Sequence, residues 1–321
     1  MSFEILLTNL TNPTLLFFLF GIIAASLKSD LEIPQQSTKF ISIYLLFSIG
    51  FKGGQELQHA EQGTEIIKAI LFGTGIAAII PIYCFYILRK RLGVSNAGAI
   101  AASYGSVSAI TFITGVSYLE LHGQTFNSHM IAVMAMMELP AIVVAFVLIS
   151  LYEEAAAKTQ SMGSIIRHSL TNGSVLMLLG SLIIGLIADN KQAEGIKPFT
   201  TDIFKGFLAL FLLEVGMVTA RRFSAFKTYG LYAFIFGIIT PLVNGCLVAY
   251  ASKFIVELPG DRFIFAILAA SASYIAVPAA MRLAAPKADP GLYIPMAIGV
   301  TFPFNITVGM PIYYAIVHHF V

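Results

Sequence analysis

Long apolar runs separated by short polar stretches make up the chain from end to end. A transmembrane helix needs about 20 mostly apolar residues to cross the hydrocarbon core of a bilayer. We therefore expect an all-α polytopic membrane protein with ten transmembrane helices. In chain order the ten predicted spans cover residues 11–28, 39–58, 66–88, 97–118, 129–151, 172–188, 202–220, 229–254, 263–283 and 291–317.

The composition excludes several classes of protein. Of the 321 residues, 57% are apolar and only 11% are charged, and the mean hydropathy is +0.84. Ordinary soluble domains carry roughly 25% charged residues, so a cytosolic enzyme and a disordered chain are excluded. The net charge of +2 gives no strong field for nucleic acid. Cys84 and Cys246 lie inside apolar segments, so we expect neither a disulfide framework nor a metal cluster.

The histidines and serines do not indicate an enzyme. The six histidines lie in predicted loops, at span edges or at the end of the chain, and their spacing matches no set of metal ligands. We expect them to be solvated, and we expect no metal site and no organic cofactor. Residues 105–109, GSVSA, depart from the G-x-S-x-G motif, and no intramembrane histidine is placed to activate a serine.

The distribution of Lys and Arg predicts the orientation. With the N-terminus outside, the cytoplasmic side carries 12 of these residues and the outer side carries 7. The positive-inside rule then favours an inner-membrane protein with both termini outside. Residues 152–172 form the longest polar stretch and are expected to contain a short surface helix.

The two halves of the sequence resemble each other. Four pairs of residues follow in the same order at offsets of 160 to 168, namely Gly50 with Gly216, Pro81 with Pro241, Ala101 with Ala269 and Pro140 with Pro303. We predict two five-span repeats, 1–151 and 172–321, joined by a cytoplasmic loop, 152–171. An odd number of spans inverts the second copy, and inverted repeats are typical of alternating-access transporters. The alternative is a duplicated scaffold without transport.

The fourth and ninth spans are expected to be broken helices. The fourth carries a cluster of serines around Gly105, and the ninth carries serines followed by Pro278. A proline inside a helix clashes with the carbonyl four residues earlier, here that of Tyr274. Opened half-helices offer N–H groups to a small anion, while carbonyl and hydroxyl oxygens suit Na⁺. The alternative for the serines is close helix packing.

Four further polar residues lie within predicted spans. Glu138, before Pro140, is a candidate for binding Na⁺, carrying a proton or bonding to an opened helix. Asn305 and Asn244 each have two interpretations, as a site residue or as a cap on a broken helix. Glu214 is expected to be a buried polar contact.

The chain resembles the sodium-dependent bicarbonate transporter family over nearly its whole length. The stretches that carry the resemblance are IAASYGSVSAITF, MELPA, LAASASYIAVPAAMR and GVTFPFN. The resemblance implies a fold like that of the bile-acid sodium symporters, with two inverted five-helix repeats and crossing discontinuous helices 4 and 9. It also implies a gate domain from spans 1, 2, 6 and 7, a core domain from spans 3–5 and 8–10, and a homotrimer.

The resemblance also implies binding residues. Bicarbonate is expected near Gly105, Ser106, Ser108, Ala272, Ser273 and Tyr274. Sodium is expected close by, at oxygens of the same loops and of neighbouring spans, for which the candidates are Ser103, Thr111, Glu138, Ser271 and Asn305.

The chain departs from the cyanobacterial members of that family at three places. Tyr274 stands where those transporters have Asp after the serine run, and Glu138 stands where they have Asp before proline. The loop tied to a small cytoplasmic regulatory protein is only residues 152–172 here. We predict a Na⁺ symporter of bicarbonate in the lipid bilayer. The alternatives are Na⁺- or H⁺-coupled transport of another small anion or carboxylate, and a membrane anion sensor or scaffold.

Overall fold

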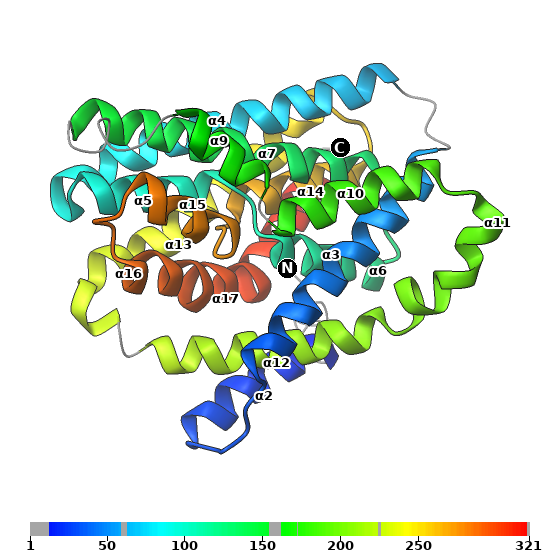
Figure 1. Ribbon diagram of the computed structural model, residues 1–321, viewed down its shortest axis with the longest axis horizontal. Coiled ribbons are helices and arrows are strands. Elements are labelled where there is room, and N and C mark those ends of the chain that lie inside the picture. The colour runs from blue at the N-terminus through cyan, green and yellow to red at the C-terminus, as the bar shows by residue number, and fades with distance from the viewer. Residues whose placement is uncertain (1–12, 59–62, 154–161, 172, 224–225, 320–321) are drawn as a thin grey trace. The chain divides into compact units, whose positions relative to one another are not determined.

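The computed structural model describes residues 13–58, 63–153, 162–171, 173–223 and 226–319. Within these ranges all regular structure is helical and no β-strand occurs (Figure 1). Among the described residues, six helical stretches are long and apolar enough to cross a membrane: Gly63–Leu92, Val94–Leu121, His129–Tyr152, Pro198–Arg221, Gly230–Phe254 and Pro290–His319. Shorter apolar helices cover Leu16–Ser26 and Leu176–Ile187. The chain is therefore a multi-pass membrane protein.

The chain divides into two compact units, Met1–Glu61 with Met177–Thr228, and Gln62–Leu176 with Tyr229–Val321. The helices of the first unit are α2 (Pro13–Ser26), α3 (Gln35–Leu57), α10 (Gly173–Ile187, in this unit from Met177 onward), α11 (Asn190–Ala193), η1 (Glu194–Ile196), η2 (Pro198–Asp202) and α12 (Phe204–Phe223). Those of the second unit are α4 (Gly63–Leu92), α5 (Val94–Gly105), α6 (Ala109–Leu121), α7 (His129–Tyr152), α9 (Met162–Leu170), α13 (Phe226–Ala251, in this unit from Tyr229 onward), η3 (Ser252–Phe254), α14 (Pro259–Ala270), α15 (Ala276–Ala284), α16 (Pro290–Met296), η4 (Ala297–Thr301), α17 (Phe302–Phe304), η5 (Asn305–Gly309) and α18 (Met310–His319).

Glycines bring the helices of the first unit into backbone contact. A Cβ atom added at Gly21 of α2 would lie 2.1 Å from the carbonyl oxygen of Leu213 on α12. A Cβ added at Gly216 of α12 would lie 2.1 Å from the carbonyl oxygen of Phe18. Small residues that let backbones approach in this way are typical of helix packing in membranes, where the hydrophobic effect does not drive association.

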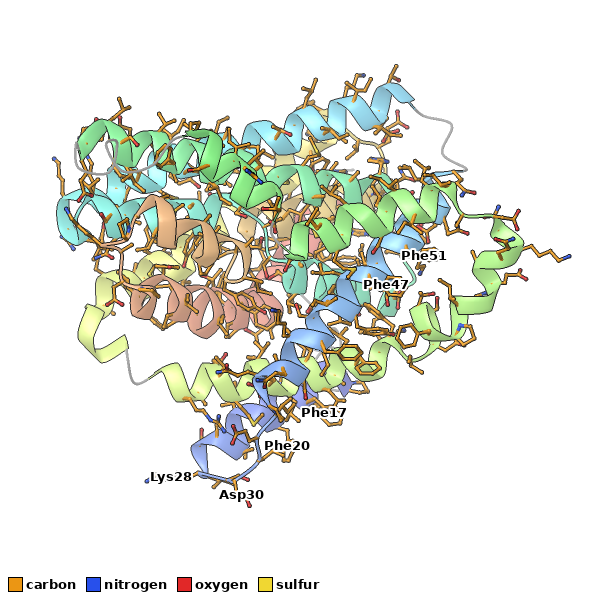
Figure 2. The ribbon with its side chains drawn as sticks, viewed as in Figure 1. Phe17, Phe20, Lys28, Asp30, Phe47 and Phe51 are labelled. Carbon is orange, nitrogen blue, oxygen red and sulfur yellow. The ribbon has the colours of Figure 1, made fainter. Side chains whose placement is uncertain are left out.

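The outer face of α2 carries large apolar side chains. Phe17 and Phe20 are 41% and 51% exposed, which suits a helix that faces lipid (Figure 2). Lys28 and Asp30 lie at the turn that follows this helix (Figure 2). Lys28 has φ 57°, and its N–H donates to the carbonyl oxygen of Ala25 while the Ser29 N–H donates to that of Ala24. The helix therefore ends in a Schellman motif, with Lys28 where glycine is more usual.

Two short helices, α5 and α14, lie at the centre of the second unit. α5 packs against α4 and α7, whereas α14 packs against α6 and α18. Every residue of α14 from Gly260 to Ala270 is buried. A helix that is buried on all sides belongs to the interior of a bundle. The outer helices α4 and α13 instead expose apolar side chains such as Leu71 and Leu247.

Polar contacts join the end of α7 to neighbouring segments of the second unit. The Lys287 ammonium lies 2.5 Å from Glu153 Oε1, and the Ser95 hydroxyl donates to Glu153 Oε2 at 2.6 Å. These two hydrogen bonds hold the pKa of the Glu153 carboxyl below its usual range. Through Glu153, the last turn of α7 is therefore joined both to the start of α5 and to the segment after α15.

The observed helices lie where the spans were expected, and they differ from that expectation in their helical geometry. Helices occupy all ten predicted segments within the described residues, and α9 confirms the short helix expected in the polar loop. The tenth segment differs most, because it contains two π-helical stretches, η4 and η5, between α16 and α18. A hydropathy pattern does not distinguish a π-helical turn from an α-helical one, since both keep the same apolar composition.

Candidate functional site

The first break lies in the fourth span. α5 ends at Gly105, and Ser106 then takes an extended conformation with φ −81° and ψ 173°. α6 begins at Ala109, and the Thr111 N–H donates to the Ser108 hydroxyl oxygen at 3.3 Å. Ser108 therefore caps the second half-helix, which is the role that serine fills at a helix N-terminus.

The second break lies in the ninth span. α14 ends at Ala270, Ser271 is extended with φ −82° and ψ 168°, and α15 begins at Ala276. Tyr274 lies inside this break, as the sequence predicts. Pro278 is the third residue of α15, where its missing N–H is not needed for an intrahelical bond. The proline therefore lies in the first turn of the second half-helix rather than within a continuous helix.

Hydrogen bonds join the two breaks directly. The Ser273 N–H donates to the Ser103 carbonyl oxygen at 2.8 Å, and the Ser103 hydroxyl donates to the Ser273 carbonyl oxygen at 2.6 Å. The Ser108 N–H donates to the Ser271 hydroxyl oxygen at 2.9 Å. All of these residues are buried. The breaks thus satisfy some of each other's backbone groups, which an interior without water requires.

Gly105 lets the end of α5 pack tightly against two other helices. A Cβ atom at Gly105 would lie 2.3 Å from Pro81 Cγ on α4 and 3.1 Å from Ala141 Cβ on α7. The first distance is shorter than Cβ atoms adopt, so only glycine fits without a shift of the proline ring. The first break is therefore held against the middle of α4 and α7.

Asparagines cap the carbonyl end of α14. Asn305 Nδ2 donates to the Ala270 carbonyl oxygen at 2.7 Å, and Asn244 Nδ2 donates to that of Ala269 at 3.3 Å. The Asn305 Oδ1 accepts from the Tyr313 hydroxyl at 3.1 Å. Of the two interpretations given for each asparagine, the capping role is confirmed for both. Sodium binding by Asn305 stays a prediction.

Three of the predicted site residues have buried oxygens without a hydrogen-bond partner among the described residues. They are the Ser106 hydroxyl, the Tyr274 hydroxyl and Glu138 Oε2. Ser106 is fully buried, at 0% exposed. An unpaired polar atom in the interior is uncommon, and a role in binding an ion or a small ligand is one of its ordinary explanations. Ser106 and Tyr274 both lie in a break, and Ser106 is the more deeply buried of the two.

The structure brings most of the predicted residues together and leaves one apart. The residues at the two breaks or within one turn of them are Ser103, Gly105, Ser106, Ser108, Thr111, Ser271, Ala272, Ser273 and Tyr274. Asn305 joins them through the Ala270 carbonyl. Glu138 lies on α7, three residues before the Ala141 that faces Gly105, and it has no hydrogen bond to either break.

Thr301 and Tyr104 also belong to this network, although neither was among the predicted site residues. The Thr301 hydroxyl donates to the Gly237 carbonyl oxygen at 2.8 Å, so its oxygen accepts from the Tyr104 hydroxyl at 2.7 Å. Tyr104 lies on α5, immediately before Gly105, whereas Thr301 ends the π-helical stretch η4. π-Helical turns are frequent at functional sites. The prolines around Asn305 were the available sequence signal for an irregular tenth span.

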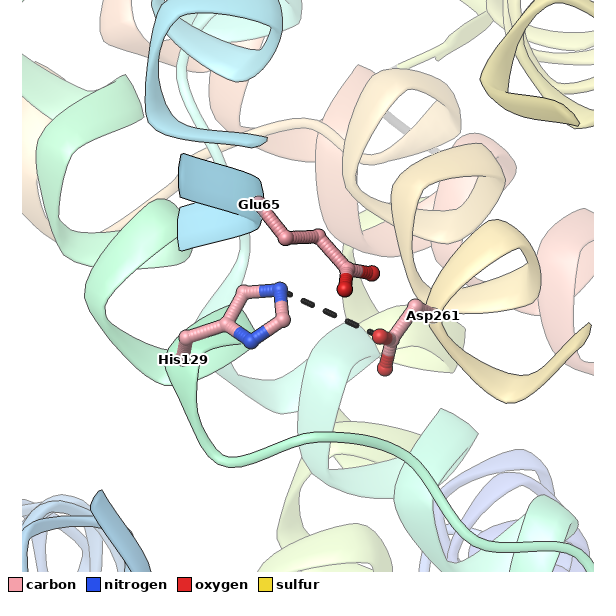
Figure 3. A group of neighbouring side chains, drawn as sticks. All are labelled: Glu65, His129 and Asp261. Carbon is pink, nitrogen blue, oxygen red and sulfur yellow. Dashed lines mark ion pairs between the residues drawn. The ribbon is translucent and has the colours of Figure 1, made fainter. Parts of the chain in front are cut away.

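The expectation that the histidines are solvated is wrong for His129. Its side chain is buried, at 3% exposed, and it lies beside Asp261 and Glu65 (Figure 3). His129 is the first residue of α7, a position that hydropathy assigns to a span edge and hence to water. The tertiary structure buries it by packing the start of α14, about 130 residues later in the chain, against it.

The two breaks have the chemistry of a paired ion site. α6 and α15 begin at the breaks, so their N-terminal ends, which carry positive dipole charge, lie next to them. α5 and α14 end there, and their C-terminal ends present carbonyl oxygens of negative partial charge. An anion and a cation can therefore bind at neighbouring positions, with hydroxyl groups as additional ligands.

A family model described as Na+-dependent bicarbonate transporter superfamily matches residues 13–318, which is nearly the whole chain. A search of curated proteins finds no match to the chain.

Proposed function

The chain belongs to the Na⁺-dependent bicarbonate transporter superfamily, and on this premise we propose that it is a sodium-coupled symporter of bicarbonate. The observation that carries the proposal is the reciprocal hydrogen bonding of the two helix breaks through Ser103 and Ser273. It supports a single site to which both broken helices contribute. Membership of this superfamily also favours transport over catalysis.

In the proposed site, bicarbonate binds at the N-terminal ends of α6 and α15, near Ser106 and Ser273. The unpaired Ser106 hydroxyl supports this role, because it has a donor available for an anion oxygen. Sodium binds at carbonyl and hydroxyl oxygens of the same breaks, including those of Ser103 and Ser271. The positive charge of Na⁺ next to the anion lowers the electrostatic cost of holding either ion in the membrane interior.

We further propose that the two compact units serve as gate and core. The second unit contains both broken helices, which supports its assignment as the core that carries the site. Movement of the core against the gate would expose the site to the two sides of the membrane in turn. The proposed orientation has both termini outside the inner membrane, and the proposed assembly is a homotrimer.

The inverted repeat is part of this proposal. In the first unit, the inverted repeat is supported by two helix contacts that are each made through a pair of glycines. Gly54 of α3 and Gly185 of α10 approach each other as Gly21 and Gly216 do, since a Cβ at either would lie 2.1–2.2 Å from a carbonyl oxygen of the opposite helix. Gly21 and Gly185 are 164 residues apart, and Gly54 and Gly216 are 162 apart. Both offsets fall within the range of the sequence repeat, although the contact matches Gly216 with Gly54 rather than with Gly50, one helical turn earlier.

The test is uptake of radiolabelled bicarbonate into proteoliposomes, with an inward Na⁺ gradient or with K⁺ in its place, at fixed pH. We expect accumulation only with Na⁺, and its loss in Ser106→Ala. Ser150→Ala is the matched control, because the Ser150 hydroxyl is also buried without a partner among the described residues but lies near the end of α7. Equal uptake in Na⁺ and K⁺ would contradict sodium coupling.

A second candidate function is proton-coupled transport of a small anion. The unpaired Glu138 Oε2 favours it, because a carboxyl without a partner in the interior can bind and release a proton. The same liposomes separate the two candidates. Uptake that persists in K⁺, follows an imposed pH gradient and is lost in Glu138→Gln supports proton coupling.

A further inference from the structure

Three helices of the second unit begin at one place and bring together two carboxylates and an imidazole. Glu65 is the third residue of α4, His129 is the first of α7, and Asp261 is the third of α14. One potential ligand atom from each side chain lies within 4.8 Å of the others (Figure 3). This cluster is separate from the helix breaks and has no part in the proposed transport site.

The imidazole of His129 has an unpaired nitrogen that faces the cluster. His129 Nε2 is buried and has no hydrogen-bond partner among the described residues. It lies 3.9 Å from Asp261 Oδ2, which is too far for a hydrogen bond. Two ligands that are each about 2.1 Å from one Zn²⁺ in a tetrahedral arrangement lie roughly 3.4 Å apart. The observed gap therefore needs to close by only about half an ångström for both atoms to bind one ion.

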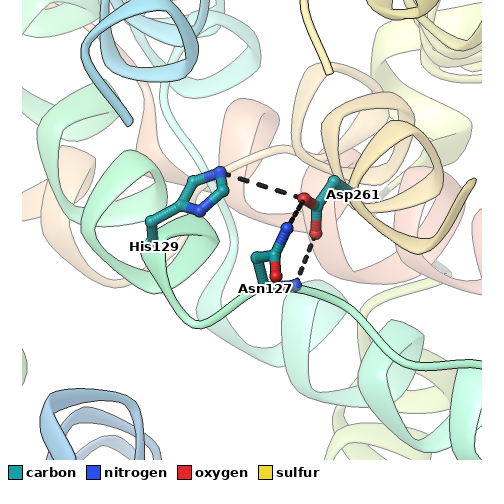
Figure 4. A network of polar contacts seen from close by, with 3 residues as sticks. All are labelled: Asn127, His129 and Asp261. Atoms are coloured by element: carbon teal, nitrogen blue, oxygen red, sulfur yellow. Dashed lines mark hydrogen bonds and ion pairs between the residues drawn. The ribbon is translucent and has the colours of Figure 1, made fainter. Parts of the chain in front are cut away.

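The carboxylate of Asp261 is already oriented by a neighbouring residue. The Asn127 backbone N–H donates to Asp261 Oδ1 at 2.6 Å, and Asn127 Nδ2 donates to Asp261 Oδ2 at 2.8 Å (Figure 4). Carboxylates that bind metals are ordinarily held by such outer hydrogen bonds, and each oxygen keeps a lone pair for the ion.

The helix N-termini alone do not account for this cluster. Positive dipole ends account for the presence of acidic side chains such as Glu65 and Asp261 in the first turns of their helices. They do not stabilise a buried imidazole whose Nε2 is unpaired. Metal ions bind deprotonated ligands, and two carboxylates with a neutral imidazole carry two negative charges, which suits a divalent cation.

We propose that Glu65, His129 and Asp261 bind a divalent transition-metal ion of the Zn²⁺ class. Imidazole nitrogen favours Zn²⁺ and similar ions over Mg²⁺ and Ca²⁺, which prefer oxygen ligands only. Three protein ligands leave the fourth position of a tetrahedral ion to water. The bound ion links the starts of α4, α7 and α14, and α14 is the helix whose other end forms the second break. Zn²⁺ binding therefore restrains one half of a broken helix.

The test is titration calorimetry of the full chain in detergent with ZnCl₂, using an affinity tag free of histidine, together with the Tm at each Zn²⁺ concentration. We expect one Zn²⁺ per chain and a Tm that rises with Zn²⁺, because an ion that binds only the folded state stabilises it. Glu65→Gln and His129→Gln should each weaken binding by about tenfold or more, by analogy with the loss on altering outer-shell groups.

Glu257→Gln is the matched control, because Glu257 is exposed and precedes Asp261 by four residues without belonging to the cluster. If His129→Gln does not fold, Glu65→Gln decides, since Glu65 is only half-buried. Three results would overturn the proposal. They are no Zn²⁺ binding by the wild type, binding that Glu65→Gln leaves unchanged, and Mg²⁺ or Ca²⁺ binding equal to that of Zn²⁺ with no effect of His129→Gln.

Discussion

Ser271 and Ser106 both lie in the breaks, but their hydroxyl groups differ in hydrogen bonding. The Ser271 hydroxyl accepts from the Ser108 N–H and donates to the Leu268 carbonyl oxygen at 2.9 Å. The Ser106 hydroxyl has no partner among the described residues. One serine therefore holds the breaks together, while the other is available to a ligand.

At the residue scale, we expect Ser271→Ala to lower the free energy of unfolding by about 1–3 kcal/mol. The substitution leaves the buried Ser108 N–H without its acceptor, and an unpaired buried donor costs about this much. Ser106→Ala removes no hydrogen bond and should leave the Tm within the error of the wild type. Thermal unfolding of both variants in detergent without added ligand provides the measurement, and an equal loss of Tm in the two variants would contradict these roles.

In the first unit, α2 and α12 pack with their backbones in contact at glycines. Gly21 and Gly216 face each other's helices, and neither position has room for a Cβ atom. Gly206, ten residues earlier on the same helix as Gly216, has nothing within 4 Å of an added Cβ. The helix α12 thus contains a glycine that packing requires and a glycine that packing does not.

At the element scale, Gly216→Ala should lower the free energy of unfolding by about 3 kcal/mol. Overpacking an interior typically costs about 1–3 kcal/mol, and this position belongs at the upper end of that range. The added methyl group meets the Phe18 backbone, which moves only if α2 moves with it. Gly206→Ala should be neutral or slightly stabilising, because alanine favours helix over glycine. The two variants are compared by Tm and by yield of folded protein. If both lose the same stability, the close contact of α2 and α12 is not what Gly216 supplies.

The two breaks bring N-terminal and C-terminal helix ends together in the interior of the second unit. Elsewhere in this unit, a long helix is interrupted at a single proline such as Pro241, and the Thr301 hydroxyl donates to the Gly237 carbonyl oxygen that this proline leaves without its helix partner. Because N-terminal ends carry positive and C-terminal ends negative partial charge, the proposed site holds bicarbonate and Na⁺ at neighbouring positions. Occupation by one ion then changes the electrostatic energy of the other.

At the scale of the whole molecule, we expect Na⁺ and bicarbonate each to raise the affinity of the protein for the other by the same factor. Thermodynamic linkage requires this equality, and such couplings are typically about 5–150-fold. Calorimetry measures the bicarbonate Kd with Na⁺ and with choline at equal ionic strength, and the Na⁺ Kd with and without bicarbonate. Independent affinities would mean that the two ions do not share one site.

Much of the helical architecture is predictable from the chain alone. Apolar runs reveal the spans because lipid excludes unpaired backbone and charge over their length. The breaks near Gly105 and before Pro278 also follow from local sequence, since small residues and proline weaken a helix wherever they stand. These features depend on interactions between residues a few positions apart, which the sequence shows directly.

The sequence could not show which polar groups meet. Ser103 and Ser273 are 170 residues apart, and their pairing depends on how two buried helices pack. The same holds for Asn305 at the end of α14, and for the burial of His129 beside Asp261. The sequence by itself thus determined where helices span the membrane and where they open, because those properties are local. Only the tertiary structure decided which openings face each other and which titratable side chains are buried together, because those properties arise from contacts between distant segments.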